Sequence, residues 1–263
     1  MKHAPVVAPR DSICAAIQTA SAKGRPALVG FLTAGFPTRQ GFKENLAAVA
    51  SVCDVVEIGV PFSDPMADGT TIQRASVAAL ADGVTLPWIL EELGSLNPRH
   101  AAPILLMSYL NPMLSFGQGA LPRAAAAAGV AGFIVPDLPF EESGELKAAL
   151  ESEGLALVQM VTPVTPPQRL GLLCREAKGF VYAVTMTGTT GKSADVPADV
   201  LEYMDRVKRL SSVPVCAGFG IRSRQQVARF AGHVDGVVVG SALVEVLERG
   251  EDVTAFLRSL RED

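Results

Sequence analysis

The sequence predicts one α/β domain folded as a (β/α)8 barrel, and three observations support this class. The chain has 263 residues, and such barrels commonly contain about 250 residues in a single domain. Short apolar runs rich in Val, Ile and Phe alternate with longer segments of helical periodicity. Eight of these runs are present, and near-continuous apolar strands that alternate with helices are typical of a parallel sheet. Eight strand–helix repeats favour closure of that sheet into a barrel.

The predicted elements follow one another without interruption. The apolar runs predict strands at 27–32, 55–59, 103–108, 132–135, 156–161, 180–184, 213–218 and 236–240. Segments rich in Ala, Leu, Glu and Arg predict helices between them at 38–51, 70–82, 119–128, 141–152, 166–176, 200–210 and 223–230, with an eighth from Ser241. Gly129 follows a run of alanines and is the residue expected to cap that helix.

Further helices are expected outside the eight repeats. They lie before the first strand (13–23), after the second unit (85–96) and at the C-terminus (251–261). No linker, charge block or change of composition divides the chain. We therefore expect a flexible N-terminal tail over residues 1–12 and one catalytic barrel domain over 13–263.

Composition narrows the functional class. The net charge of −4 and the pI near 5.5 argue against a nucleic-acid surface, which needs clustered Lys and Arg, but leave a small anionic ligand open. The four cysteines are scattered without C-x-x-C spacing, so neither a zinc site nor a disulfide framework is indicated. No signal-peptide core and no apolar stretch long enough for a membrane span are found. We expect a soluble cytoplasmic protein that binds no membrane.

A carboxylate interrupts the second apolar run, "VVEIGVPFSDPMADG" (55–69). Under the alternation of a strand, Glu57 shares a face with Val55 and Gly59, which directs it into the barrel mouth. A carboxyl that is partly desolvated there has a raised pKa and suits proton transfer near neutral pH. The alternative is a buried glutamate paired with arginine, but no arginine lies in any of the eight runs. Asp64 and Asp68 follow on a loop, where aspartate often serves only to form turns.

Glycine-rich segments near the end of the chain indicate a phosphate site. "AGFGI" (217–221) closes the seventh run, and "VGSAL" (239–243) joins the eighth to a helix start. In these barrels the loops after strands seven and eight commonly bind phosphate through backbone N–H groups and a helix N-terminus. Each glycine alone could be a simple turn. A third polar segment, "TMTGTTGKSADVPAD" (185–199), has the composition of a mobile lid.

Several chemistries are disfavoured by what the runs lack. No lysine lies in a strand run, which argues against a Schiff-base aldolase. The three histidines are far apart in sequence and none closely follows a strand with a carboxylate partner, which disfavours a metal-dependent aldolase. No G-x-G-x-x-G follows the first strand to suggest a dinucleotide. The residues alone thus predict a phosphate-ester enzyme that uses acid–base carboxylates without metal or cofactor, and they do not identify the substrate.

Seven motifs resemble a known family in order and spacing. "EIGVPFSDPMADG" resembles the signature of the tryptophan synthase alpha subunit family, and the likeness continues through "GFLTAGFPT" (30–38), "LLMSYLNPM" (105–113), "FIVPDLPFEES" (133–143), "TGTTG" (187–191), "AGFGI" and "VGSAL". It covers about residues 13–260. The resemblance implies a TIM barrel that is a lyase of tryptophan biosynthesis. It would cleave indole-3-glycerol phosphate to indole and glyceraldehyde 3-phosphate without metal or Schiff base.

The resemblance also implies roles for individual residues. Glu57 would be the general acid–base, and Asp68 would hydrogen-bond the indole N–H. Other matched positions are the indole pocket at Phe31, Tyr109, Tyr182 and Phe219, the phosphate site at Gly191, Gly220, Gly240 and Ser241, the lid residue Thr190 and the partner contact Asp64. Each aromatic could instead be core packing, and Asp64 could simply form a turn.

Three kinds of protein share these residues. The first, which we favour, is an alpha subunit in an α2β2 complex, where the partner beta subunit carries pyridoxal phosphate and this chain has no cofactor. The second is a free-standing indole-3-glycerol-phosphate lyase. The third is a non-catalytic regulatory subunit, against which intact Glu57 and Asp68 argue.

Overall fold

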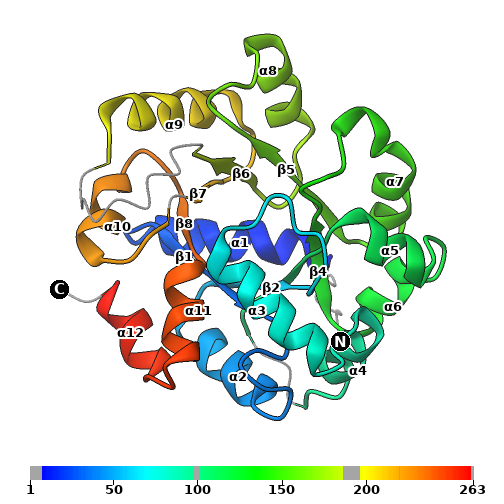
Figure 1. Cartoon of the computed structure of the whole chain (residues 1–263). Coiled ribbons are helices and arrows are strands. Elements are labelled where there is room, and N and C mark those ends of the chain that lie inside the picture. Colours follow the sequence, from blue (N-terminus) through cyan, green and yellow to red (C-terminus); the bar gives the residue numbers. More distant parts are fainter. Residues whose placement is uncertain (1–7, 98–100, 186–195, 219, 262–263) are drawn as a thin grey trace, which may run out of the picture.

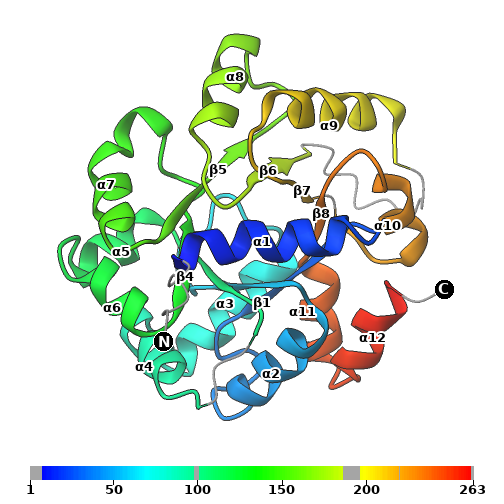
Figure 2. The same cartoon turned by 180° about the vertical axis from the view of Figure 1, so that it is seen from behind.

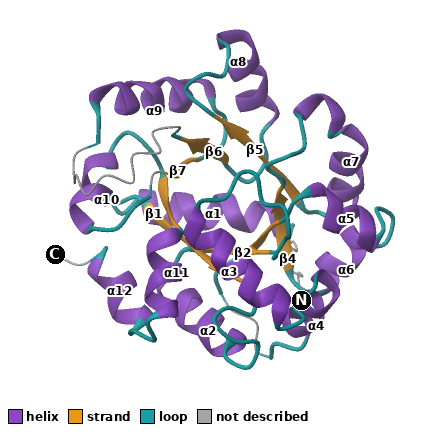
Figure 3. Ribbon diagram, viewed as in Figure 1, coloured by secondary structure: helices purple, strands orange, loops and turns teal. Residues whose placement is uncertain are grey.

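Eight parallel strands close into a barrel in chain order, as the sequence predicts (Figures 1 and 3). The computed structural model describes residues 8–97, 101–185, 196–218 and 220–261. The strands are β1 (Ala27–Thr33), β2 (Val55–Gly59), β3 (Ile104–Met107), β4 (Val130–Ile134), β5 (Ala156–Val161), β6 (Val181–Val184), β7 (Val215–Gly218) and β8 (Gly236–Val239). Pairing of β1 with both β2 and β8 leaves no free sheet edge.

Helices surround the barrel on its outer side (Figure 1). They are α1 (Pro9–Ser21), α2 (Phe42–Val52), α3 (Thr70–Ala81), α4 (Leu86–Gly94), α5 (Leu110–Phe116), α6 (Leu121–Ala127), α7 (Gly144–Ser152), α8 (Pro167–Glu176), α9 (Ala198–Leu210), α10 (Arg224–Phe230), α11 (Ser241–Glu248) and α12 (Val253–Ser259), with a 3-10 turn η1 (Phe140–Glu142). The three extra helices expected before the first strand, after the second unit and at the C-terminus are α1, α4 and α12. None of the described helices is both long and apolar enough to cross a membrane.

Helix α1 lies across one end of the barrel, as the opposite views of Figures 1 and 2 show. Its buried residues Ile13, Ile17 and Ala20 join the core inside the barrel, with Val29 and Val55. The helix begins at Pro9, four residues before the start expected from the apolar pattern. Proline is favoured in the first turn because its missing N–H has no intrahelical partner there. The N-terminal end of the barrel is therefore closed, and the site must open at the other end.

The two faces of β2 separate as its alternation predicts. Val55 packs inside the barrel, whereas Val56 and Ile58 belong to the larger core between the strands and the surrounding helices. Glu57 lies beside Phe31 of β1 and Leu105 of β3 in the sheet register. The carboxylate therefore faces the barrel interior, which confirms the orientation predicted for it.

Helix α5 was absent from the predicted elements. Its seven residues, LNPMLSF, are too few to show an apolar period, and they include Pro112. The proline lies in the first turn, where a helix tolerates it. The backbone N–H of Leu110 donates to Asp137 Oδ1 at 2.9 Å, a contact from a loop far along the chain. A long-range hydrogen bond of this kind leaves no local signal in the sequence.

Candidate active site

A cavity of about 830 Å³ opens among the loops that follow β2, β4, β5, β7 and β8. It contains both carboxylates, Glu57 and Asp68, and the glycine-rich positions predicted to bind phosphate, Gly220, Gly240 and Ser241. Residues that are far apart in sequence therefore converge at the carboxyl ends of the strands, where barrels of this class hold their active sites.

Glu57 is fully buried in this cavity. Neither of its carboxyl oxygens has a hydrogen-bond partner among the described residues. Burial, with a smaller contribution from the nearby charge of Asp68, raises its pKa to about 8. Because a buried charge without a partner is costly, the carboxyl is protonated at neutral pH. Glu57 can therefore both donate and accept a proton near neutrality.

Asp68 is half-buried on the loop between β2 and α3. Its backbone carbonyl accepts a hydrogen bond from Gln73 Nε2 at 2.8 Å, and the neighbouring Ala67 N–H donates to Tyr109 Oη at 2.9 Å. Burial raises the pKa of Asp68 to about 6, although a hydrogen bond from Tyr109 opposes this rise. Asp68 is thus ionised at neutral pH while Glu57 is protonated. Paired groups with separated pKa values are typical of acid–base sites.

Phe31 and Tyr182 are two of the aromatic residues that line the cavity, and the ring of each lies against a glycine. A Cβ atom built on Gly59 would lie 2.6 Å from the ring of Phe31, and one on Gly218 would lie 2.6 Å from the ring of Tyr182. Any larger residue would displace these rings. Burial and the nearby Glu57 raise the pKa of Tyr182 well above its ordinary value, which keeps the phenol neutral. The cavity therefore offers flat, uncharged walls beside the two carboxyls.

Gly220, Gly240 and Ser241 also line the cavity, and we call this part of it the phosphate end. Gly220 has φ +66°, a conformation that favours glycine, and a Cβ built there would meet nothing within 4 Å. Gly240 precedes α11, whose N-terminus has no side-chain cap. Uncapped N–H groups at a helix start attract anions. This end of the cavity can therefore bind a phosphate without a basic side chain.

Two other predicted site residues, Tyr109 and Asp64, are absent from the cavity lining. Tyr109 is buried beside it, where its ring stacks on Phe62 with centroids 5.1 Å apart. Asp64 is exposed outside it and accepts a hydrogen bond from Ser63 Oγ. Phe219, Thr190 and Gly191 lie outside the described residues.

The sequence prediction missed part of the cavity wall. Asp137 in the loop after β4, Gln159 in β5 and Arg169 in α8 also line it. Gln159 is 7% exposed and interrupts the apolar strand "ALVQMV", which is the same signal that identified Glu57. Asp137 stands in the quoted motif "FIVPDLPFEES" but was given no role.

No group of three or more His, Cys, Asp or Glu side chains in the described part of the chain is arranged to hold a metal ion. The cysteines at positions 14, 53, 174 and 216 are all free. Of these, Cys216 lies in the barrel interior, where burial raises its pKa well above the ordinary value and keeps it a neutral thiol.

Comparisons with known proteins agree with this geometry. A model of the family "Tryptophan synthase alpha chain" matches residues 17–261. The tryptophan synthase alpha chain of Solidesulfovibrio magneticus is 45% identical over 93% of this chain and 96% of its own length. That of Desulfovibrio desulfuricans is 46% identical over 92% and 96%.

Solved structures show the same relationship. A chain of Mycobacterium tuberculosis tryptophan synthase superposes with a TM-score of 0.87 at 37% identity and covers 94% of this chain and 96% of its own. Tryptophan synthase subunit alpha of Legionella pneumophila superposes with a TM-score of 0.86 at 30% identity, over 95% and 97%. With the family model, the sequence identity and the fold in agreement, the chain belongs to the tryptophan synthase alpha chain family.

Proposed function

We propose that this chain cleaves indole-3-glycerol phosphate to indole and glyceraldehyde 3-phosphate, as the alpha subunit of a cytoplasmic tryptophan synthase. The observation that carries the proposal is one cavity with two carboxyls of different protonation, Glu57 with a pKa of about 8 and Asp68 with a pKa of about 6. The flat walls suit an indole ring, and the glycine-rich end suits a phosphate. Membership of the family supports the choice of substrate.

Glu57 would act on both protons of the reaction. Its protonated carboxyl gives a proton to indole C3, and the resulting carboxylate takes the proton of the side-chain hydroxyl as the carbon–carbon bond breaks. The electrons of that bond return to the indole ring and restore it. Proton gain and loss balance, so indole and an aldehyde leave with Glu57 protonated again. A carboxyl with a pKa of about 8 is matched to both steps near neutral pH.

Asp68 would stabilise the charge that this proton transfer creates. Protonation at C3 places positive charge on the indole nitrogen, and an ionised carboxylate that accepts the N–H hydrogen bond stabilises it. Phe31, Tyr182 and Phe219, with Tyr109 behind them, would enclose the ring. Gly220, Gly240, Ser241 and Gly191 would bind the phosphate, with Thr190 on the lid. This route uses the protonated ring as its electron sink, so it needs neither a metal ion nor a Schiff base.

The partner in this proposal is a tryptophan synthase beta subunit, which would hold pyridoxal phosphate and convert the indole. The loop between β2 and α3 offers a surface for it, because Met66 is 84% exposed and Asp64 is exposed beside it. We propose Asp64 as a contact residue within an α2β2 complex.

The test is indole release from indole-3-glycerol phosphate by the purified chain, with and without a beta subunit. We expect slow release by the chain alone and faster release in the complex. Full activity without any response to the beta subunit would favour a free-standing lyase instead. No release in either condition, with intact activation of the beta subunit, would make the chain a regulatory subunit and overturn the catalytic proposal.

A further inference from the structure

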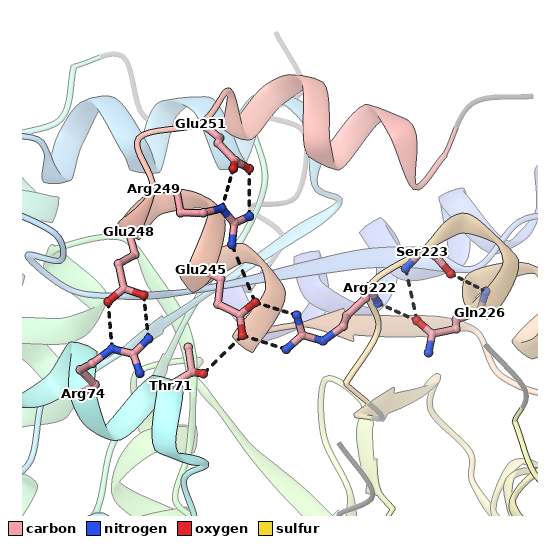
Figure 4. Close-up of polar contacts among 9 residues, drawn as sticks. All are labelled: Thr71, Arg74, Arg222, Ser223, Gln226, Glu245, Glu248, Arg249 and Glu251. Carbon is pink, nitrogen blue, oxygen red and sulfur yellow. Dashed lines mark hydrogen bonds and ion pairs between the residues drawn. The ribbon is translucent and has the colours of Figure 1, made fainter. Parts of the chain in front are cut away.

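The Glu245 carboxylate of α11 lies outside the cavity and is contacted by two other segments that contribute to the cavity wall, the loop after β7 and the start of α3 (Figure 4). Arg222 donates two hydrogen bonds to it, from Nη1 to Oε2 at 2.7 Å and from Nη2 to Oε1 at 2.8 Å. Thr71 Oγ1 donates to Oε1 at 3.4 Å. Arg249, one turn along α11, lies 4.0 Å from the same group.

The partners of Glu245 stand next to the candidate site residues in sequence. Arg222 is two residues after Gly220, in the loop that follows β7. Glu245 itself lies one helical turn after Ser241, and helical side chains lean toward the N-terminus, which brings its carboxylate over the first turn of α11. Thr71 is in the first turn of α3, directly after the loop that carries Asp68. The Glu245 side chain thus joins the Gly220 loop, the N-terminus of α11 and the start of α3.

The loop after β7 has a second attachment on its other side. The backbone N–H groups of Arg222 and Ser223 both donate to Gln226 Oε1, at 2.8 Å and 3.2 Å. Ser223 Oγ accepts from the Gln226 N–H, which completes a capping box at the start of α10. Gly220 has no side chain with which to hold its own position. Its loop is instead held by β7 on one side and, on the other, by the segment 222–223, which is bonded to α10 through Gln226 and to α11 through Glu245.

We propose that Glu245 is a positioning residue, which holds the Gly220 loop and the start of α3 against the N-terminus of α11 so that the backbone N–H groups of Gly220, Gly240 and Ser241 converge on one phosphate. The proposal rests on the function proposed above, in which Gly220, Gly240 and Ser241 bind the phosphate. Bidentate arginine–carboxylate contacts fix direction as well as distance, which a single contact does not. The side chain acts through the backbone of these segments and touches no substrate.

A purely electrostatic role makes a different prediction. Pairing with Arg222 lowers the pKa of Glu245, so a negative charge persists close to the phosphate end. If charge alone mattered, loss of the Glu245 charge would strengthen phosphate binding and loss of the Arg222 charge would weaken it. If position matters, either loss weakens binding, and the loss of both is no worse than the loss of one.

The chain supplies a matched control in Arg74 and Glu248. This pair also joins α3 to α11 with two hydrogen bonds, at 2.8 Å and 2.6 Å. Its side chains are 54% and 38% exposed, comparable with 51% and 25% for Arg222 and Glu245. In Figure 4 no dashed line joins this pair to the residues drawn from the loop after β7. Removal of this pair reports the general effect of a broken surface ion pair between the same helices.

The experiment compares Glu245→Gln, Arg222→Gln, their double variant and Glu248→Gln in the full chain. The readouts are KM and kcat for indole-3-glycerol phosphate, the calorimetric Kd of glycerol phosphate, and the thermal midpoint. We expect each of the first two variants to raise KM and Kd about three- to tenfold, with kcat within about twofold. The double variant should match the worse single variant, and Glu248→Gln should bind as the parent does.

Two results would overturn the positioning role. One is equal binding by Glu245→Gln and Glu248→Gln, and the other is tighter binding by Glu245→Gln than by the parent. If Glu245→Gln does not fold, Arg222→Gln decides between the same outcomes. If the parent binds glycerol phosphate but cleaves nothing, the proposed reaction fails while the Kd series still tests Glu245. If the parent binds no glycerol phosphate, the positioning role fails with the phosphate site.

Discussion

The two candidate catalytic carboxyls are held by different kinds of structure. Glu57 lies in a strand whose five residues are all buried and which pairs with strands on both sides. Asp68 lies on the loop after that strand, where Asp64 and Met66 are exposed. The position of Glu57 is therefore fixed by the barrel itself, whereas few buried contacts fix that of Asp68.

This difference suggests that Glu57 carries the chemistry, whereas Asp68 is the group through which a partner can regulate it. A group fixed by a sheet remains in place whenever the protein is folded, and burial is the main cause of the raised pKa of Glu57. A group on a weakly anchored loop acts only in the fraction of molecules in which the loop is docked. For Asp68 the described anchors include the Tyr109 hydroxyl and the Gln73 amide. A partner that binds this loop can change the contribution of Asp68 without moving Glu57.

The largest effect is expected for Glu57→Gln, which keeps the shape of the side chain and removes the transferable proton. General acid–base catalysis typically contributes about 10²- to 10⁴-fold, so we expect the rate of indole formation to fall by that factor. Because Glu57 is held by the barrel, addition of a beta subunit should not rescue the variant. A Glu57→Gln enzyme that kept most of its rate would exclude Glu57 as the proton-transfer group.

The same substitution is expected to stabilise the protein at alkaline pH. The pKa of Glu57 is about 8 in the folded state against an ordinary 4.5, so the folded state binds the proton more tightly. The parent therefore loses stability as pH rises from about 4.5 to about 8, by at most about 5 kcal/mol. Glutamine does not ionise and escapes this loss.

Urea unfolding at pH 5 and pH 9 measures the effect. The free energy of unfolding of Glu57→Gln should exceed that of the parent at pH 9, and the difference should shrink at pH 5. The control is Glu153→Gln, because Glu153 is exposed. If Glu57→Gln and the parent lost equal stability between the two pH values, the buried carboxyl would not be the source of the loss.

Regular periodicity explains what the sequence could predict. The eight strands follow from near-continuous apolar runs, which strands buried on both faces require. The inward direction of Glu57 follows from the alternation of side chains along its strand. The positions of Gly220, Gly240 and Ser241 at strand ends follow from the same register. The position of these residues relative to the predicted strands is therefore sufficient to predict that they meet at one end of the barrel.

The missed features depend on contacts between distant segments. Helix α5 starts where Leu110 meets Asp137, and the Arg222–Glu245 pair spans 23 residues. Neither contact repeats with a period, so no pattern marks it. Gln159 is a polar residue in an apolar strand, which is a signal that the sequence does show. Unlike the strand of Glu57, however, its strand is not followed by a loop that contains aspartates. Tyr109 matched a pocket position, and only the structure shows it bonded to the Asp68 loop.

A smaller effect is expected for Asp68→Asn, because the amide oxygen can still accept the indole N–H but carries no charge. We expect about a 10- to 100-fold loss of kcat/KM, because a hydrogen bond to a charged group contributes about 1.5 to 3 kcal/mol. The parent should be active between pH values of about 6 and about 8, since Asp68 must be ionised and Glu57 protonated. Asp68→Asn should lose the acidic limb of this profile. Persistence of that limb would assign it to another group.

The smallest effect is expected for Tyr109→Phe, which tests the anchoring of the loop. Phenylalanine can still stack on Phe62 but cannot accept the Ala67 N–H or hydrogen-bond Asp68. Loss of the second bond raises the pKa of Asp68, so the acidic limb of the kcat/KM profile should move to higher pH. Loss of both bonds should lower kcat/KM at pH 7 about three- to tenfold, the effect of about one net hydrogen bond.

The control for this variant is Tyr203→Phe, because the buried Tyr203 hydroxyl has no hydrogen-bond partner among the described residues. It should leave kcat/KM unchanged. A beta subunit that holds the loop closed replaces the lost anchor, so the defect of Tyr109→Phe should shrink in the complex while that of Glu57→Gln does not. Equal defects with and without the beta subunit would mean that the loop stays docked without Tyr109. Asp68 would then be as firmly held as Glu57, and the contrast between strand and loop would disappear.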